Sequence, residues 1–331
     1  MNSPKKILVV VESIDSEDSS GSKANVALIH NLKKLGYDLR VFHYTLKEVK
    51  LKDITCVAIL ENRVSVLFYL SRIERYIRNI FRIKLNRYLE NRFGFSFTLF
   101  NDRNSIISAL KNIKDFTPDV VLTLSKGGSF RPHQALLQMP EFHDKWMAYI
   151  HDPYPMHWYP PPYPWFEPGF EQKEHFMKEM ALKAKYIAFP SKLLMDWMGS
   201  HFKPYAEKGM VLPHQLDNIP ETSENFPLYF DPDCFNLVHA GNLLRGREPY
   251  GLLKGFEKFL ESNPGAKKEA RLLFIGGLNY YTPELLQFEK RVSQFKTSPE
   301  KLSFQLVQNI QQTSAVNIIL EAKSEISPFL P

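Results

Sequence analysis

One segment of the sequence combines the residue types that bind a diphosphate. Gly241 and Asn242 follow a predicted strand, and Arg245 and Arg247 precede a helix that we expect to begin near Pro249. Glycine admits close approach of a backbone, arginine donates bidentate hydrogen bonds to phosphate, and a helix N-terminus favours negative charge. The spacing predicts that Gly241, Asn242, Arg245 and Arg247 bind a diphosphate. The alternative is a pair of solvent-exposed arginines on a turn.

A second segment could carry a catalytic histidine and a platform for a sugar ring. His151 directly follows the predicted strand Trp146–Ile150, and ligands of doubly wound sheets bind beyond the carboxyl ends of strands. It is our candidate catalytic residue, with a hydrogen-bonded structural histidine as the alternative. The proline-rich run after it contains Trp158 and Tyr159, whose rings suit stacking on a sugar. That run could equally be a loop packed against its own domain.

Two further loops lie at the same predicted edge. Ser20 and Gly21 belong to a polar loop before a helix, where backbone N–H groups could hold an anion or sugar hydroxyls. The alternative is a mobile polar loop with a helix cap. The loop lacks Gly-x-Gly-x-x-Gly, which argues against a dehydrogenase. Gly276 and Gly277 follow a later strand and would make room for a nucleobase or ribose.

The elements that must position these residues alternate between strands and helices. Short β-branched runs predict the strands, and apolar residues at helical spacing predict the helices. The predicted strands are Lys6–Val11, Leu39–Phe42, Val120–Leu124, Trp146–Ile150, Tyr186–Phe189, Met210–Leu212, Phe235–His239, Arg271–Ile275 and Val316–Leu320. Predicted helices of the later part include Tyr250–Leu260 and Pro283–Phe295. The pattern indicates an α/β fold of two tandem doubly wound Rossmann-like domains, residues 1–217 and 218–331, with a proline-dotted linker over 218–233.

Composition excludes several classes of protein. Of 331 residues, 44% are apolar and 24% charged, which is the balance of a globular protein. Cys56 and Cys234 are too few for a disulfide framework. The sequence shows neither a secretory leader nor a membrane-spanning run, so we expect a cytoplasmic protein. Asp231 and Asp233 resemble an Asp-x-Asp metal motif, but they precede a strand and read as a turn. We predict no metal and no cofactor.

The net charge of +6 is concentrated in one segment. Residues 63–92 contain eight basic side chains against Glu74 and Glu90, so they account for the whole excess. The basic residues are Arg63, Arg72, Arg75, Arg78, Arg82, Lys84, Arg87 and Arg92. The apolar side chains that share one helical face here are Leu70, Ile73, Ile77, Ile80 and Phe81, and we expect this face to be core. The opposite face, with Arg72, Arg75, Arg78 and Arg82, could dock on anionic lipid or be a solvated surface.

With these residues placed, the chain resembles the GT-B glycosyltransferases, and in particular the family-4 retaining enzymes. The segments that carry the resemblance are Ser20–Gly21, Tyr149–Pro153, Tyr186–Lys192, Val211–His214 and Gly241–Pro249. The resemblance implies transfer of a sugar from a UDP- or GDP-linked donor to an acceptor hydroxyl with retention, in polysaccharide or glycolipid synthesis. It makes Arg247 the diphosphate ligand and assigns the donor sugar to Glu325 and Ser327. The acceptor, a sugar or lipid-linked group, would lie at Ser20, Gly21, Gly127, Gly128, Trp158 and Tyr159.

The chain departs from the family pattern in two places. Asn242 and the Arg245/Arg247 pair replace the family's usual arginine and lysine. The acidic donor-sugar motif begins at Glu325 and the chain ends at Pro331, so we expect the second domain to be truncated. The alternative is a genuinely short, inactive relative. The rival functions are a non-catalytic GT-B-like binding module and a nucleotide-sugar epimerase or inverting transferase of the same fold. Nucleic-acid binding is disfavoured, because the basic segment lacks a recognisable module.

Overall fold

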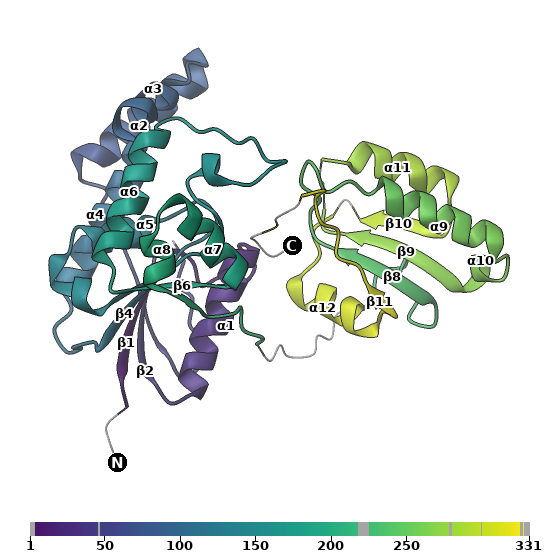
Figure 1. Cartoon of the computed structure of the whole chain (residues 1–331), viewed down its shortest axis with the longest axis horizontal. Helices are drawn as coiled ribbons and strands as arrows, with labels where there is room; N and C mark the ends of the chain where they lie inside the picture. Colours follow the sequence, from purple (N-terminus) through teal and green to yellow (C-terminus); the bar gives the residue numbers. More distant parts are fainter. Residues whose placement is uncertain are drawn as a thin grey trace. The chain divides into compact units, whose positions relative to one another are not determined.

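The computed structural model describes residues 4–45, 47–217, 225–277, 280–298, 300–324 and 327. The chain forms two compact units (Figure 1). The first unit contains residues 1–160 and 164–217. The second contains residues 218–331 together with the short segment Pro161–Tyr163.

The first unit is built on a seven-stranded parallel sheet in the order β3-β2-β1-β4-β5-β6-β7. Its strands are β1 (Lys6–Val11), β2 (Asp38–His43), β3 (Thr55–Ala58), β4 (Val120–Leu124), β5 (Trp146–Tyr149), β6 (Tyr186–Phe189) and β7 (Gly209–Val211). Alternation along β1 sends Leu8 and Val10 into one core and Val9 and Val11 into the other. Burial on both faces is what a parallel sheet covered by helices requires.

Helices cover both faces of this sheet, and short 3-10 turns occur at η1 (Pro140–Lys145) and η2 (Met156–Trp158). The helices are α1 (Ser20–Lys34), α2 (Val66–Phe81), α3 (Leu85–Phe93), α4 (Phe97–Lys111), α5 (Arg131–Leu137), α6 (Phe170–Lys183), α7 (Lys192–His201) and α8 (Pro204–Glu207). At four of these helices the hydroxyl of the preceding serine accepts a hydrogen bond from a backbone N–H of the first turn. The serines are Ser19, Ser65, Ser96 and Ser191. These caps fix where α1, α2, α4 and α7 begin.

The second unit has a four-stranded parallel sheet in the order β10-β9-β8-β11. Its strands are β8 (Phe235–Ala240), β9 (Ala270–Ile275), β10 (Phe295–Ser298) and β11 (Val316–Asn317). Its helices are α9 (Tyr250–Ser262), α10 (Ala266–Glu269), α11 (Thr282–Arg291) and α12 (Phe304–Thr313). Leu272 and Leu273 are fully buried on opposite faces of β9, so helices enclose this sheet on both sides as well.

The predicted fold class of two doubly wound domains is confirmed, with corrections to individual elements. The predicted helix Pro283–Phe295 is wrong at its end, because α11 stops at Arg291 and Phe295 is a fully buried residue of β10. The last predicted strand, Val316–Leu320, reaches only Asn317. The sequence patterns do not predict the strands β3 and β10, because their sequences, Thr-Cys-Val-Ala and Phe-Lys-Thr-Ser, do not form apolar β-branched runs. Among the described helices, none is long and apolar enough to cross a bilayer.

The position of α3 depends on two glycines whose backbones meet. Gly94 ends α3 and Gly169 precedes α6, and both have positive φ, +81° and +70°. A Cβ added at Gly169 would lie 2.1 Å from the carbonyl oxygen of Glu90 and 2.6 Å from the Cα of Gly94. Any side chain at Gly169 would therefore force α3 and α6 apart.

We predict that Gly169→Ala lowers the free energy of unfolding by about 3 kcal/mol or more, because backbone strain and a backbone clash add. Gly36→Ala is the matched control. Gly36 also has positive φ, +87°, but a Cβ there would meet nothing within 4 Å, so the expected loss is about 1 kcal/mol. Urea unfolding of the two variants measures the difference. Equal losses would show that the close approach contributes nothing.

Candidate active site

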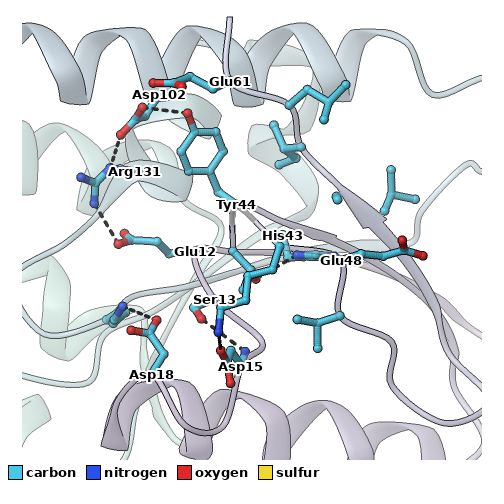
Figure 2. Close-up of a pocket in the computed structure, with 18 of the residues that line it drawn as sticks. Glu12, Ser13, Asp15, Asp18, His43, Tyr44, Glu48, Glu61, Asp102 and Arg131 are labelled. Atoms are coloured by element: carbon cyan, nitrogen blue, oxygen red, sulfur yellow. Dashed lines mark hydrogen bonds and ion pairs between the residues drawn. The ribbon is translucent and has the colours of Figure 1, made fainter. Parts of the chain in front are cut away.

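The first unit has a polar cavity of about 1160 Å³ at the carboxyl edge of its sheet (Figure 2). Glu12 follows β1, Tyr44 follows β2, Lys126 follows β4, and each lines the cavity. Arg72 and Asp102, from α2 and α4, line it from the helical layer. The edge is the one at which ligands bind in doubly wound sheets.

A half-buried guanidinium, that of Arg131, organises one wall of this cavity (Figure 2). The Nη1 of Arg131 lies 2.8 Å from a carboxylate oxygen of Glu12, and its Nε lies 2.7 Å from one of Asp102. The same Nη1 donates to the hydroxyl of Ser129 at 2.6 Å, and that hydroxyl donates to Glu12. The hydroxyl of Tyr44 donates to Asp102 at 2.8 Å. One cation thus connects the ends of β1 and β2 with α4 and α5.

Burial determines how these groups ionise. It raises the pKa of the Asp102 carboxyl, and the charge of Arg131 and the hydrogen bond from Tyr44 oppose that rise. Burial would lower the pKa of Arg131, but the carboxylates of Glu12 and Asp102 raise it overall, so the guanidinium stays charged. Burial and the charge of Asp102 raise the pKa of Tyr44. The Tyr44 phenol therefore stays protonated and serves as a donor.

The cavity lining contains as many acidic side chains as basic ones. Among the described residues that line it, seven are carboxylates and seven are lysines or arginines. A lining of one sign would attract a bare polyion, whereas interspersed donors and acceptors match the hydroxyl groups of a sugar, each of which donates and accepts. The cavity is therefore suited to a polyhydroxylated ligand.

The predicted acceptor residues Ser20, Gly21, Gly127 and Gly128 come together at this edge. Ser20 and Gly21 form the first turn of α1, and a Cβ at Gly21 would lie 3.6 Å from the Cα of Lys126. Gly127 and Gly128 occupy the tight turn after β4, where φ of Gly127 is +54°. The Nζ of Lys126 lies 2.6 Å from Asp18, which ties this turn to the loop before α1. Their role in binding stays a prediction.

His151 lies at the carboxyl end of β5 but does not line the cavity. The Nδ2 of Asn25 donates to the carbonyl of Ser125, so its Oδ1 accepts from the Nε2 of His151 at 2.7 Å. The Nδ1 of His151 then accepts from the Nε2 of His214 at 3.0 Å. Both ring nitrogens thus have partners within the first unit. Burial, followed by the neighbouring His214 and His133, lowers the pKa of His151 to about 3.

The predicted acceptor aromatics Trp158 and Tyr159 pack against the first unit. Trp158 is buried, and its ring stacks on that of His201 with 4.8 Å between centroids. The indole of Trp197 donates to the carbonyl of Trp158 at 2.7 Å. Tyr159 is half-buried against Trp165, with ring centroids 4.6 Å apart. Trp158 and Tyr159 do not line the cavity, and neither do Ser20, Gly21, Gly127 and Gly128. A Cβ at Gly128 would lie 3.0 Å from the Cε of Met156, so the glycine turn borders the beginning of the aromatic run.

In the second unit, two predicted glycines hold the carboxyl ends of β8 and β9 close together. Gly241 has φ of +137°, and its N–H donates to the carbonyl of Ile275 at 2.7 Å. A Cβ at Gly276 would lie 2.5 Å from the carbonyl oxygen of Gly241. Gly277, with φ of +80°, donates to Ser298 of β10 at 3.2 Å. Backbone approach, and not only room for a ligand, therefore requires glycine at Gly276.

The predicted diphosphate arginines differ in their surroundings. Arg245 is exposed, with its guanidinium 6.0 Å from the ring centre of Tyr280, and Asn242 is exposed as well. Arg247 is buried, and its Nη2 lies 3.0 Å from a carboxylate oxygen of Glu321. Of the predicted donor-sugar residues, Ser327 donates to Glu321, whereas Glu325 lies outside the described residues. The structure thus assembles Arg247, Glu321 and Ser327 where β8 and β11 end.

Sequence reasoning missed the groups that shape both sites. Glu12 and Tyr44 directly follow strands, and Glu321 follows shortly after β11. The rule that ligands bind beyond the carboxyl ends of strands, the carboxyl-edge rule, could therefore have found them. Asp102 and Arg131 lie on separate helices, and no local pattern marks them.

No family model matches the chain, and no curated protein matches it. Solved structures do. The N-terminal domain of a Candida albicans trehalose-6-phosphate phosphatase has a TM-score of 0.56 at 13% identity, over 98% of this chain and 78% of that one. An E. coli trehalose-6-phosphate structure bound with UDP-2-fluoro glucose has a TM-score of 0.56 at 11% identity, over 95% of this chain and 77% of that one. A Rickettsia africae glycosyltransferase has a TM-score of 0.53 at 14% identity, over 97% of this chain and 73% of that one. The expected GT-B fold is confirmed, and membership of family 4 stays a prediction.

The buried neutral histidines make stability depend on pH. The pKa of His151 and that of His133 are each lowered to about 3, chiefly by burial, and the unfolded chain titrates near 6.5. The unfolded state therefore binds more protons below pH 6.5, and stability that is present above this pH is lost as pH falls. We predict a loss of about 2 kcal/mol per histidine between pH 7 and pH 5, measured by urea unfolding.

His151→Gln should remove one such contribution from the pH dependence, whatever it does to stability at pH 7. Burial raises the pKa of Asp152 to about 6, which works in the opposite direction, and comparison of variant with parent cancels it. His175→Gln on the exposed side of α6 is the control. An unchanged slope in His151→Gln would contradict the buried neutral state.

Proposed function

We propose that the protein is a glycosyltransferase that moves a sugar from a nucleoside-diphosphate sugar to an acceptor hydroxyl. The second unit would bind a UDP- or GDP-linked donor, and the first unit would bind the acceptor. The observation that supports this most directly is the Arg247–Glu321 pair at the carboxyl edge of the second sheet, a cation for a diphosphate beside a carboxylate for sugar hydroxyls. The fold is shared with a structure that contains UDP-2-fluoro glucose.

In the proposed reaction, the bond between C1 of the sugar and the diphosphate oxygen breaks, and a bond from C1 to the acceptor oxygen forms. The proton of the acceptor hydroxyl leaves to the departing diphosphate. Negative charge on that diphosphate is the main electrostatic demand of the transition state. Arg247 and Arg245 would meet it with guanidinium groups, and the N-terminus of α9, at Tyr250, begins three residues after Arg247. The family-4 resemblance adds retention of configuration, and the sequence itself suggests independence of metal ions.

The acceptor would occupy the polar cavity of the first unit. Ser20, Gly21, Gly127 and Gly128 do not line this cavity but lie beside Lys126, which does, and they would contact an acceptor that extends past it. The resemblance suggests a sugar or lipid-linked acceptor from polysaccharide or glycolipid synthesis. The sequence itself suggests a cytoplasmic protein and a contact with anionic membrane through Arg72, Arg75, Arg78 and Arg82. His151 enters this proposal as the group that orients the donor sugar or leaving group. It would have to exchange its bond to Asn25 or His214 for one to the ligand.

A non-catalytic binding module is the second candidate, because both nitrogens of His151 and the guanidinium of Arg247 already contact protein groups. An epimerase or an inverting transferase of the same fold would use the same donor site. The stereochemistry of the product distinguishes the transferases, and formation of an epimer without any acceptor identifies the epimerase.

The proposal predicts that calorimetric titration detects binding of UDP or GDP. Arg247→Ala should weaken it by about a hundredfold, because a buried cation that contacts the diphosphate is lost. Arg291→Ala, an exposed arginine of the second unit that pairs with Glu257, should leave affinity unchanged. Thermal unfolding of each variant controls for folding, and Arg245→Ala at an exposed position provides the test if Arg247→Ala is destabilised. Failure of the parent chain to bind either nucleotide would contradict the donor site.

Glu321→Gln separates the sugar from the nucleotide. We predict that it weakens binding of the intact sugar nucleotide by about tenfold, because a carboxylate that accepts from sugar hydroxyls is lost. Binding of the free nucleoside diphosphate should not weaken, since Glu321 adds no attraction for an anion. Equal weakening of both ligands would mean that Glu321 only positions Arg247.

A further inference from the structure

Helix α2 turns its apolar side away from the body of the first unit. Its apolar residues recur at helical spacing, yet within Val66–Phe81 the buried residue is Ser71. Ile73 is 54% exposed, Tyr76 63% and Ile80 54%. The expectation that this face is core is therefore wrong. An amphipathic helix of a globular protein normally packs its apolar side inward, so this exposed side calls for a partner.

The exposed apolar surface extends into the segment that follows. Arg82 ends α2 in the left-handed conformation, and α3 has no fully buried residue. Figure 1 shows α2 and α3 at the outer end of the first unit. We call residues 64–93 the helical surface; its exposed large apolar side chains are Val64, Val66, Tyr69, Leu70, Ile73, Tyr76, Ile80, Phe81, Ile83, Tyr88 and Phe93.

The basic residues lie on and beside this surface. Arg75, Arg82 and Arg87 are exposed, and within the described part of the chain no carboxylate pairs with them. With Glu74 and Glu90 as the acids of residues 63–92, the segment keeps a charge of +6. Long arginine stems can place guanidinium groups among phosphate headgroups while apolar neighbours enter the hydrocarbon boundary. Tyrosines such as Tyr69 and Tyr76 suit that boundary as well.

This combination favours an anionic bilayer over other partners. A second copy of the chain would bring two such segments, each of +6, against one another, and like charges across an interface disfavour association. A nucleic acid would satisfy the arginines but would leave the apolar stripe in water. Anionic lipid satisfies both, because its headgroups are negative and its acyl boundary is apolar.

We infer that the helical surface docks on anionic lipid bilayers and holds the cavity of the first unit at the membrane. The cavity shares this helix, since Arg72 and Arg75 of α2 line it. A headgroup at the bilayer surface would then be the natural occupant of the cavity. This last step rests on the proposed function and narrows the acceptor to a lipid-linked one.

Sedimentation with vesicles tests the docking. The chain should bind vesicles made of equal parts phosphatidylglycerol and phosphatidylcholine and should not bind phosphatidylcholine alone. Ile73→Ser/Ile80→Ser should reduce the partition coefficient by about tenfold or more. Arg82→Gln/Arg87→Gln should reduce it by about thirtyfold and should weaken its dependence on salt. All four side chains are exposed and none lines the cavity.

Matched controls lie elsewhere on the first unit. Leu35→Ser/Leu182→Ser removes two exposed leucines, and Lys111→Gln/Lys114→Gln removes two exposed cations. Both should leave the partition unchanged. Equal binding to the two kinds of vesicle, or an equal loss in the controls, would overturn the inference. So would self-association of the parent that Ile73→Ser/Ile80→Ser abolishes in the absence of vesicle binding.

Titration with UDP and GDP on the same preparations separates this inference from the proposed function. Nucleotide binding without vesicle binding would refute the docking alone. Vesicle binding without nucleotide binding would refute the glycosyltransferase and leave a lipid-binding protein.

Discussion

The candidate acceptor site depends on the charge of one half-buried side chain, Arg131. Removing a guanidinium from water costs several kcal/mol, and the cost is offset only where carboxylates and hydrogen bonds surround it. Glu12, Asp102 and Ser129 provide that surrounding, and Tyr44 completes it by donating to Asp102. The requirement works in both directions, because without Arg131 the carboxylates of Glu12 and Asp102 would each lose their cationic partner. The wall of the cavity is therefore determined by charge pairing as much as by apolar packing.

Features of the first unit that depend on neighbouring residues in the sequence could be predicted, and features that depend on contacts between distant residues could not. Strands such as Lys6–Val11 and Val120–Leu124 depend on local β-branched runs, and their predicted bounds match the structure. The carboxyl-edge rule then locates the sites, because it needs only the ends of those strands. Asp102 and Arg131 are 29 residues apart in the sequence and on different helices. Their pairing follows from how the helices pack, which no local pattern contains.

Helix α2 shows a different limit of the same reasoning. Periodicity correctly predicts a helix and an apolar stripe there, but it does not say which side faces the protein. That choice depends on contacts from distant residues. The hydroxyl of Ser65 caps the helix and donates to Asn101 of α4, and the hydroxyl of Ser105 accepts from the N–H of Asn62 just before the helix. These polar contacts attach the beginning of α2 to α4 and leave Ile73 and Ile80 in solvent.

The second unit also contains an arginine paired with a carboxylate, Arg247 with Glu321, but this pair is open to a different role. Arg247 is buried, and its guanidinium contacts the carboxylate of Glu321, whose own side chain is about one-third exposed. On the proposed function, a diphosphate would approach Arg247 as a competing anion, and repulsion would turn Glu321 toward the sugar hydroxyls. The pair would then keep the guanidinium in place without donor and release a hydrogen-bond acceptor when donor binds. Arg131, held by two carboxylates, has no such exchange open to it. On the proposed function, Arg131 would therefore shape the wall of the acceptor cavity, whereas Arg247 would bind the diphosphate.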